Sequence, residues 1–137
     1  MRKWAFGAGM LLLVGVAFLA RGQRAAARSQ REMRAEVDSI MVREDLSRVY
    51  CRVIGRPHTS HRIDSVTFHS LSDERIRLKS TDIDPLYYER GFQWEDEGEI
   101  ALELDFPTMA PEAAESFYMI FHTPYGQVYS TYRPALK

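Results

Sequence analysis

Residues 98–132, GEIALELDFPTMAPEAAESFYMIFHTPYGQVYSTY, decide the fold class of this chain. In their first part apolar residues alternate with Glu, Ala and Asp, and the apolar positions are Ile100, Leu102, Leu104 and Phe106. A period of two is typical of a β-strand with one buried and one solvated face. The pattern therefore predicts a strand that turns these four side chains toward a core.

The rest of the stretch predicts a C-terminal hairpin. Residues 117–121 form a nearly continuous aromatic and aliphatic run, which is typical of a strand buried on both faces. Pro124 and Gly126 then provide a fixed φ and access to positive φ, which tight turns require. A return strand continues through Tyr132.

Further short strands are expected before this stretch. They are indicated at residues 50–54, 63–68 and 76–78, by apolar alternation, and in two aromatic segments, 86–88 and 92–94, which flank a turn at 89–91. Residues 81–85 (TDIDP) interrupt the pattern, and residues 95–98 predict a tight turn. About seven strands at this spacing indicate a sandwich or barrel.

We therefore predict a mainly β fold, a small antiparallel β-sandwich with immunoglobulin-like layering over residues 48–137. The alternative is an α+β fold with a helix packed on one curved antiparallel sheet. The chain has a single cysteine, Cys51, so the bridged cysteine pair of immunoglobulin domains is absent and the name describes layering only. Cys51 is expected to be a small buried side chain.

The N-terminal residues indicate export or membrane anchoring. Residues 4–20 carry no charged side chain and follow Arg2 and Lys3, which predicts an apolar helix and assigns residues 1–22 to an export signal or a membrane anchor. Ala20 and Gly22 are small residues placed for cleavage before Gln23. A retained single span is the alternative, and a cytosolic protein with a buried apolar helix is a third.

Residues 23–47 are predicted to form an amphipathic helix or stalk, because they contain no Gly or Pro and are rich in Ala, Arg, Glu and Met. Met33, Val37, Ile40 and Met41 have the spacing of one apolar helical stripe. A basic stripe of Arg21, Arg24, Arg28 and Arg31 is expected either to contact lipid headgroups or to be a solvated face.

Charge is unevenly distributed along the chain. Residues 1–81 have 15 Lys and Arg against 8 Asp and Glu, whereas residues 82–137 have 3 against 11, although the formal net charge is only −1. The acidic second half disfavours nucleic-acid binding. A basic N-terminal part suits either an anionic partner or charge balance within the chain.

No catalytic motif stands out. His58 and His61 have a spacing that zinc ligands can have, and His69, His122, Asp82, Asp84 and the acidic run 95–99 are further candidate ligands. A zinc site needs three or four ligands and a calcium site six to eight oxygens, and neither recognised pattern is present. We predict no cofactor, no metal and no enzyme activity; the alternative is a small metal-binding or hydrolytic domain that uses these His and acidic loops.

Aromatic residues suggest an interaction surface, since such side chains are enriched at binding interfaces. The predicted patch comprises Tyr87, Tyr88, Phe92, Trp94 and Tyr125. We expect a non-enzymatic exported or membrane-anchored accessory module of the cell envelope, with a protein partner and, if residues 1–22 are retained, a membrane contact. A retained span would alternatively make the chain a subunit of a membrane complex.

Overall fold

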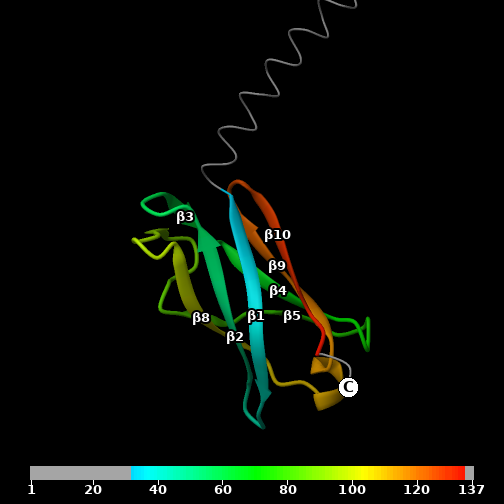
Figure 1. Cartoon of the computed structure of the whole chain (residues 1–137). Coiled ribbons are helices and arrows are strands. Elements are labelled where there is room, and N and C mark those ends of the chain that lie inside the picture. Colours follow the sequence, from blue (N-terminus) through cyan, green and yellow to red (C-terminus); the bar gives the residue numbers. More distant parts are fainter. Residues whose placement is uncertain (1–31, 135–137) are drawn as a thin grey trace, which may run out of the picture. The chain divides into compact units, whose positions relative to one another are not determined.

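The computed structural model describes residues 32–134. This part of the chain is mainly β and has antiparallel sheets, in agreement with the prediction (Figure 1). Its elements are β1 (Met33–Val42), β2 (Ser47–Gly55), β3 (Ser60–Arg62), β4 (Ser65–Ser70), β5 (Arg77–Lys79), β6 (Asp82–Asp84), β7 (Gly91–Gln93), β8 (Glu99–Phe106), a 3-10 helix η1 (Pro111–Ala114), β9 (Phe117–Thr123) and β10 (Gly126–Tyr132).

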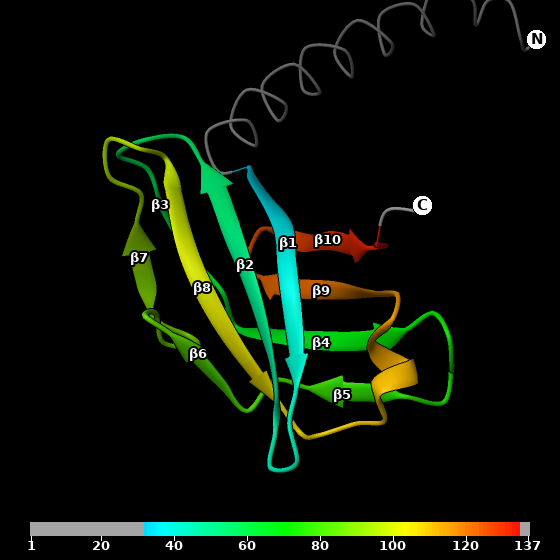
Figure 2. The ribbon, with the colours of Figure 1, turned by 60° about the horizontal axis from the view of Figure 1, so that its bottom comes forward.

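The strands form two four-stranded antiparallel sheets and a small ribbon. The first sheet has the order β1-β2-β8-β6 and the second β10-β9-β4-β5, while β3 pairs with β7. In Figure 2 the strands of the second sheet run across those of the first. The chain therefore crosses repeatedly from one sheet to the other.

One hydrophobic core joins the two sheets. Phe68 of β4 packs against Phe106 of β8, with 5.6 Å between the ring centroids, and against Phe117 of β9 at 4.5 Å. The other fully buried large side chains are Val49, Val53, Ile63, Val66, Trp94, Leu102, Leu104, Met119 and Phe121. Most of these residues come from the two sheets, and Ile63 and Trp94 directly follow β3 and β7. Each of the two sheets therefore has one inward and one outward face.

The register predicted for β8 is confirmed. Leu102, Leu104 and Phe106 are buried, and the intervening Glu103 is exposed. For β9 the prediction of burial on both faces is wrong: Phe117, Met119 and Phe121 are buried, whereas every second residue between them is only half-buried. The outward face of β9 is therefore accessible.

The predicted helix over residues 23–47 is wrong from residue 33 onward. Met33–Val42 is strand β1, which pairs with β2 and carries a bulge between Val37 and Ser39. The bulge inserts one residue and moves the inward positions from odd to even numbers, so that Ile40 faces the core again. Two alternating runs offset by one residue resemble a helical stripe, and pairing with β2 overrides the helix propensity of Ala, Glu and Arg.

The remaining N-terminal predictions lie outside the described residues. They are the export signal or anchor at 1–22, the first part of the helix, and the basic stripe Arg21, Arg24, Arg28 and Arg31. Within residues 32–134 no helix has the length and apolar character needed to cross a membrane.

Residues 81–91 also differ from the prediction. Asp82–Asp84 does not interrupt the sheet but forms β6, which pairs with β8, because Ile83 is buried between flanking exposed carboxylates. Residues 86–88 are not a strand, and the turn that follows has its positive φ at Glu89 rather than at a glycine. The turn predicted at residues 95–98 is confirmed by the hydrogen bond from the Gly98 N–H to the Glu95 oxygen, 3.1 Å.

The predicted C-terminal hairpin is confirmed, with Gly126 opposite Thr123 and Tyr132 opposite Phe117. Thr123 Oγ1 accepts a hydrogen bond from the Tyr125 N–H and donates one to the Gly126 oxygen. Gly126 has φ +124°. This side of the Ramachandran map is accessible to glycine and costly for a β-branched residue.

Replacing Gly126 with Val is expected to lower the free energy of unfolding by about 1 kcal/mol or more. The cost arises from the backbone, since a Cβ at this position has no atom within 4 Å. Urea denaturation measures it. Gly91→Val, in a strand with ordinary φ and its nearest neighbour 3.8 Å away, is the matched control; equal stability of both variants and the wild type would contradict the hairpin geometry.

Candidate functional site

The aromatic patch predicted from the sequence is divided in the structure. Phe92, Trp94 and Tyr125 gather around His61, with ring centroids 6.2, 5.6 and 5.0 Å from the imidazole. Trp94 is fully buried, and its indole N–H donates a hydrogen bond to the Val53 oxygen. Trp94 is therefore part of the core, Phe92 of β7 is half-buried, and Tyr125 is 49% exposed.

The other two members of the predicted patch, Tyr87 and Tyr88, differ in exposure. Tyr87 is 66% exposed, and the Arg90 guanidinium lies 4.9 Å from its ring centroid. Tyr88 is half-buried and packs against the core, and burial raises the pKa of its hydroxyl well above the ordinary value. Of the five predicted contacts, only Tyr87 and Tyr125 are largely exposed.

The candidate metal ligands do not converge. His58 pairs with Asp96 at 2.8 Å, and the nearby His61 is enclosed by aromatic rings. His69 and His122 instead lie in the second sheet, and both contact the Thr67 hydroxyl. No group of three or more His, Cys, Asp or Glu side chains in residues 32–134 is arranged to hold a metal.

Cys51 lies in the core, as predicted, at the centre of β2. Burial, followed by the negative charge of Asp38, raises the pKa of its thiol to about 12. A thiol in this state is a poor nucleophile. Cys51 therefore contributes packing and not chemistry.

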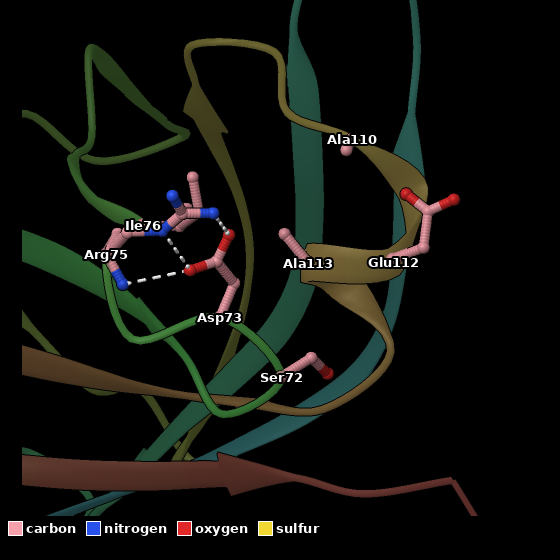
Figure 3. A pocket seen from close by; sticks show the side chains of 7 residues that line it. All are labelled: Ser72, Asp73, Arg75, Ile76, Ala110, Glu112 and Ala113. Atoms are coloured by element: carbon pink, nitrogen blue, oxygen red, sulfur yellow. Dashed lines mark hydrogen bonds and ion pairs between the residues drawn. The ribbon is translucent and has the colours of Figure 1, made fainter.

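A hollow of about 400 Å³ lies between the β4–β5 loop and η1 (Figure 3). The Arg75 guanidinium donates to both carboxylate oxygens of Asp73, at 3.0 and 3.1 Å, and these hydrogen bonds lower the pKa of Asp73. The Ala110 and Ala113 methyl groups line another part of the wall. The charge of Arg75 is thus already neutralised by Asp73, and we assign the hollow no ligand.

The outward face of the second sheet is the best-formed candidate surface. Strand alternation places eleven side chains on it, and we call them the aromatic–basic face: Ser65, Thr67, His69, Arg77, Lys79, Tyr118, Ile120, His122, Gln127, Tyr129 and Thr131. Val66, Phe68, Met119 and Phe121 point the other way, into the core. Four strands therefore present a continuous surface to solvent.

Aromatic and polar contacts organise this face. The His69 and Tyr118 rings stack with 4.7 Å between centroids and a 6° interplanar angle, and Tyr129 follows at 6.2 Å from Tyr118. The Tyr129 hydroxyl donates a hydrogen bond to Gln127 Oε1 at 3.1 Å. Tyr129 nevertheless remains 59% exposed. The stacked rings are held in place while the outermost one stays open to a partner.

The aromatic–basic face carries no carboxylate. All 19 Asp and Glu of the chain lie within residues 32–134, and they outnumber the 11 Lys and Arg of this part, yet none occupies these eleven positions. Its charged residues are Arg77 and Lys79 of β5, both exposed. Hydroxyl and imidazole N–H groups add further donors.

The outward face of the first sheet has the opposite character. Its carboxylates are Glu36, Asp38, Asp82, Asp84, Glu99, Glu103 and Asp105, and its cations are Arg34, Arg48 and Arg52. Arg52 contacts three of these carboxylates, Glu36, Asp38 and Glu99, at 2.9–3.4 Å. We call this surface the acidic face.

The pKa of His69 is expected to be below its ordinary value of 6.5, because burial and then the charges of Arg77 and His122 disfavour the imidazolium. Protonation of His69 therefore lowers the stability of the domain as the pH falls from the pKa of this residue in the unfolded state through its lower pKa in the folded state. NMR titration of the His69 ring measures it. Arg77→Gln should move the pKa upward, whereas Arg75→Gln, whose arginine pairs with Asp73, should not. An equal pKa of His69 in the wild type and in Arg77→Gln would contradict this arrangement.

Sequence analysis missed the aromatic–basic face, although part of the signal was present. Within the run 117–121, Tyr118 and Ile120 alternate with the buried residues, and His122 continues the same face. The uniformly apolar appearance of that run concealed this alternation. The neighbours on β4 and β5 follow only from the sheet order.

The comparisons with known proteins give no family assignment. No protein-family model matches the chain, and no curated protein matches it.

Proposed function

We propose that residues 32–134 form an immunoglobulin-like β-sandwich that acts as a non-enzymatic interaction module. The strand orders β1-β2-β8-β6 and β10-β9-β4-β5 correspond to A-B-E-D and G-F-C-C′ of immunoglobulin-type sandwiches. The lone cysteine and the crossing of the two sheets in Figure 2 depart from antibody domains. The likeness concerns strand order and says nothing about a ligand.

The aromatic–basic face is the binding surface in this proposal. The observation that carries it is the exclusion of carboxylates from eleven adjacent outward positions in a domain with 19 of them. Aromatic ring edges carry partial positive charge, and Arg77 and Lys79 add two exposed cations. Such a surface suits a partner that presents carboxylates.

The N-terminal sequence supports two alternative cellular locations. The apolar run at residues 4–20 supports an exported accessory module of the cell envelope if the run is cleaved. If it is retained, it supports a single-span subunit of a membrane complex, with Arg21, Arg24, Arg28 and Arg31 beside anionic headgroups. The intact mass of the protein from membrane and soluble fractions distinguishes the two.

Photo-cross-linking in the cells that naturally make this protein tests the binding surface. A photoreactive amino acid replaces Tyr129 in the full-length chain, and the matched control carries it at Glu44, which is exposed in the β1–β2 hairpin. We expect a discrete protein adduct from position 129 and none from position 44. Absence of an adduct at 129, in a variant with unchanged thermal unfolding, would overturn the proposal.

A further inference from the structure

The two outward faces of the domain are complementary in charge. We propose that the aromatic–basic face binds the acidic face of a second copy of this chain, an inference that rests on the proposed function and names its partner. The aromatic–basic face carries cations without carboxylates, and the acidic face has seven carboxylates against three arginines. Each spans a four-stranded sheet.

The acidic face contains carboxylates that lack a cation. Asp82 lies opposite Asp105, and Asp84 lies opposite Glu103, across the β6–β8 pair. Like charges directly opposite each other destabilise a sheet. Arg48 contacts Asp105 at 2.7 Å and Glu103 at 3.6 Å, which leaves the two β6 carboxylates without an ion pair in residues 32–134. A cation from outside would relieve this repulsion.

The aromatic–basic face supplies such cations. Arg77 and Lys79 are both exposed on β5 and form no ion pair with a carboxylate of residues 32–134. Their spacing along β5 equals that of Asp82 and Asp84 along β6, because each pair is separated by one residue of an extended strand. Two cations of one copy can therefore meet two carboxylates of the next in register.

The overall charge of the chain permits this contact. Residues 32–134 alone have 8 more acidic than basic residues, but the whole chain has a formal net charge of −1. Self-repulsion between full-length copies is therefore small. Because the two faces differ, the contact is heterologous and builds a chain or a ring of copies rather than a closed two-fold dimer. Salt should weaken it.

Zero-length cross-linking tests the pairing directly. A carbodiimide joins a lysine amine to a carboxylate in contact with it, and Lys79 is the only lysine in residues 32–134. Isotopically light and heavy full-length chains are mixed in detergent at low salt, treated and digested. We expect mixed-isotope peptides that join Lys79 to Asp82 or Asp84, and about ten-fold fewer of them at high salt.

Charge variants provide the controls. Lys79→Arg should abolish the cross-link but keep the concentration-dependent assembly seen by light scattering. R77E/K79E and D82K/D84K should each lower assembly about ten-fold or more, and a mixture of these two variants should restore it, because the charges are exchanged. Thermal unfolding of each variant checks the fold. A mixture that fails to associate, with both variants folded, would overturn the pairing.

The outcome at position 129 separates this inference from the proposed function. An adduct between two copies of the chain supports both. An adduct with a different protein keeps the interaction module and overturns self-association. Absence of any adduct overturns the binding surface itself.

Discussion

Replacing Leu104 with Asp is expected to leave the chain unfolded. Leu104 has no exposed surface, and its neighbours on the adjacent strands are Val49 of β2 and Ile83 of β6. Removing a buried Leu side chain alone costs about 2–5 kcal/mol. Burying a carboxylate without a partner adds several kcal/mol more, so the total approaches the whole stability of a small domain, about 5–15 kcal/mol.

The control for this variant is Ala101→Asp on the same strand. Ala101 is exposed and lies opposite Arg52, so the new carboxylate stays in water beside a cation, and the change in stability should be within about 0.5 kcal/mol. Circular dichroism and urea denaturation report on both variants. A soluble Leu104→Asp protein with a cooperative transition would contradict the inward register of β8.

Replacing Gly55 with Ala is expected to destabilise the domain by about 1–3 kcal/mol, the usual cost of overpacking. A Cβ at Gly55 would lie 2.5–2.6 Å from three atoms of the Trp94 indole. The indole cannot move away freely, because it is fully buried and hydrogen-bonded to the Val53 oxygen. The end of β2 therefore requires a residue without a side chain.

Gly91→Ala is the matched control, since its new methyl group would have its nearest neighbour at 3.8 Å, an ordinary contact. A double-mutant cycle with Trp94→Phe tests the cause. If the indole is the obstacle, Gly55→Ala should cost less in the Trp94→Phe background, with an interaction energy of about 0.5–3 kcal/mol. Strict additivity would show that the cost has another origin.

Predictions from local patterns succeeded where one strand and its turn determine the outcome. The alternation around Leu104 predicted β8, and the pair Pro124 and Gly126 predicted the hairpin. The prediction for β1 was wrong because its bulge at Val37 changes the period in the middle of the strand. The prediction for residues 81–85 was wrong because β6 consists of only three residues, too few to show a period.

The candidate site was harder to predict than the fold, because it depends on contacts between distant segments. His69 stacks on Tyr118 only because β4 pairs with β9, and no local pattern reveals that pairing. The residues of the predicted aromatic patch differ in exposure. Phe92 and Trp94 are close in sequence to Tyr87 and Tyr88, but the alternation and the ribbon turn Trp94 inward.

Strand β1 also sets a limit on proteolytic maturation. Met33 and Ala35 at its start are buried in the core, and the strand covers one long side of β2. A protease that removes an N-terminal leader must therefore cut before Met33 if β1 is to stay intact. A cut at residue 48, where the sequence placed the domain boundary, would delete β1 and uncover the unpaired backbone groups of β2, an edge prone to aggregation.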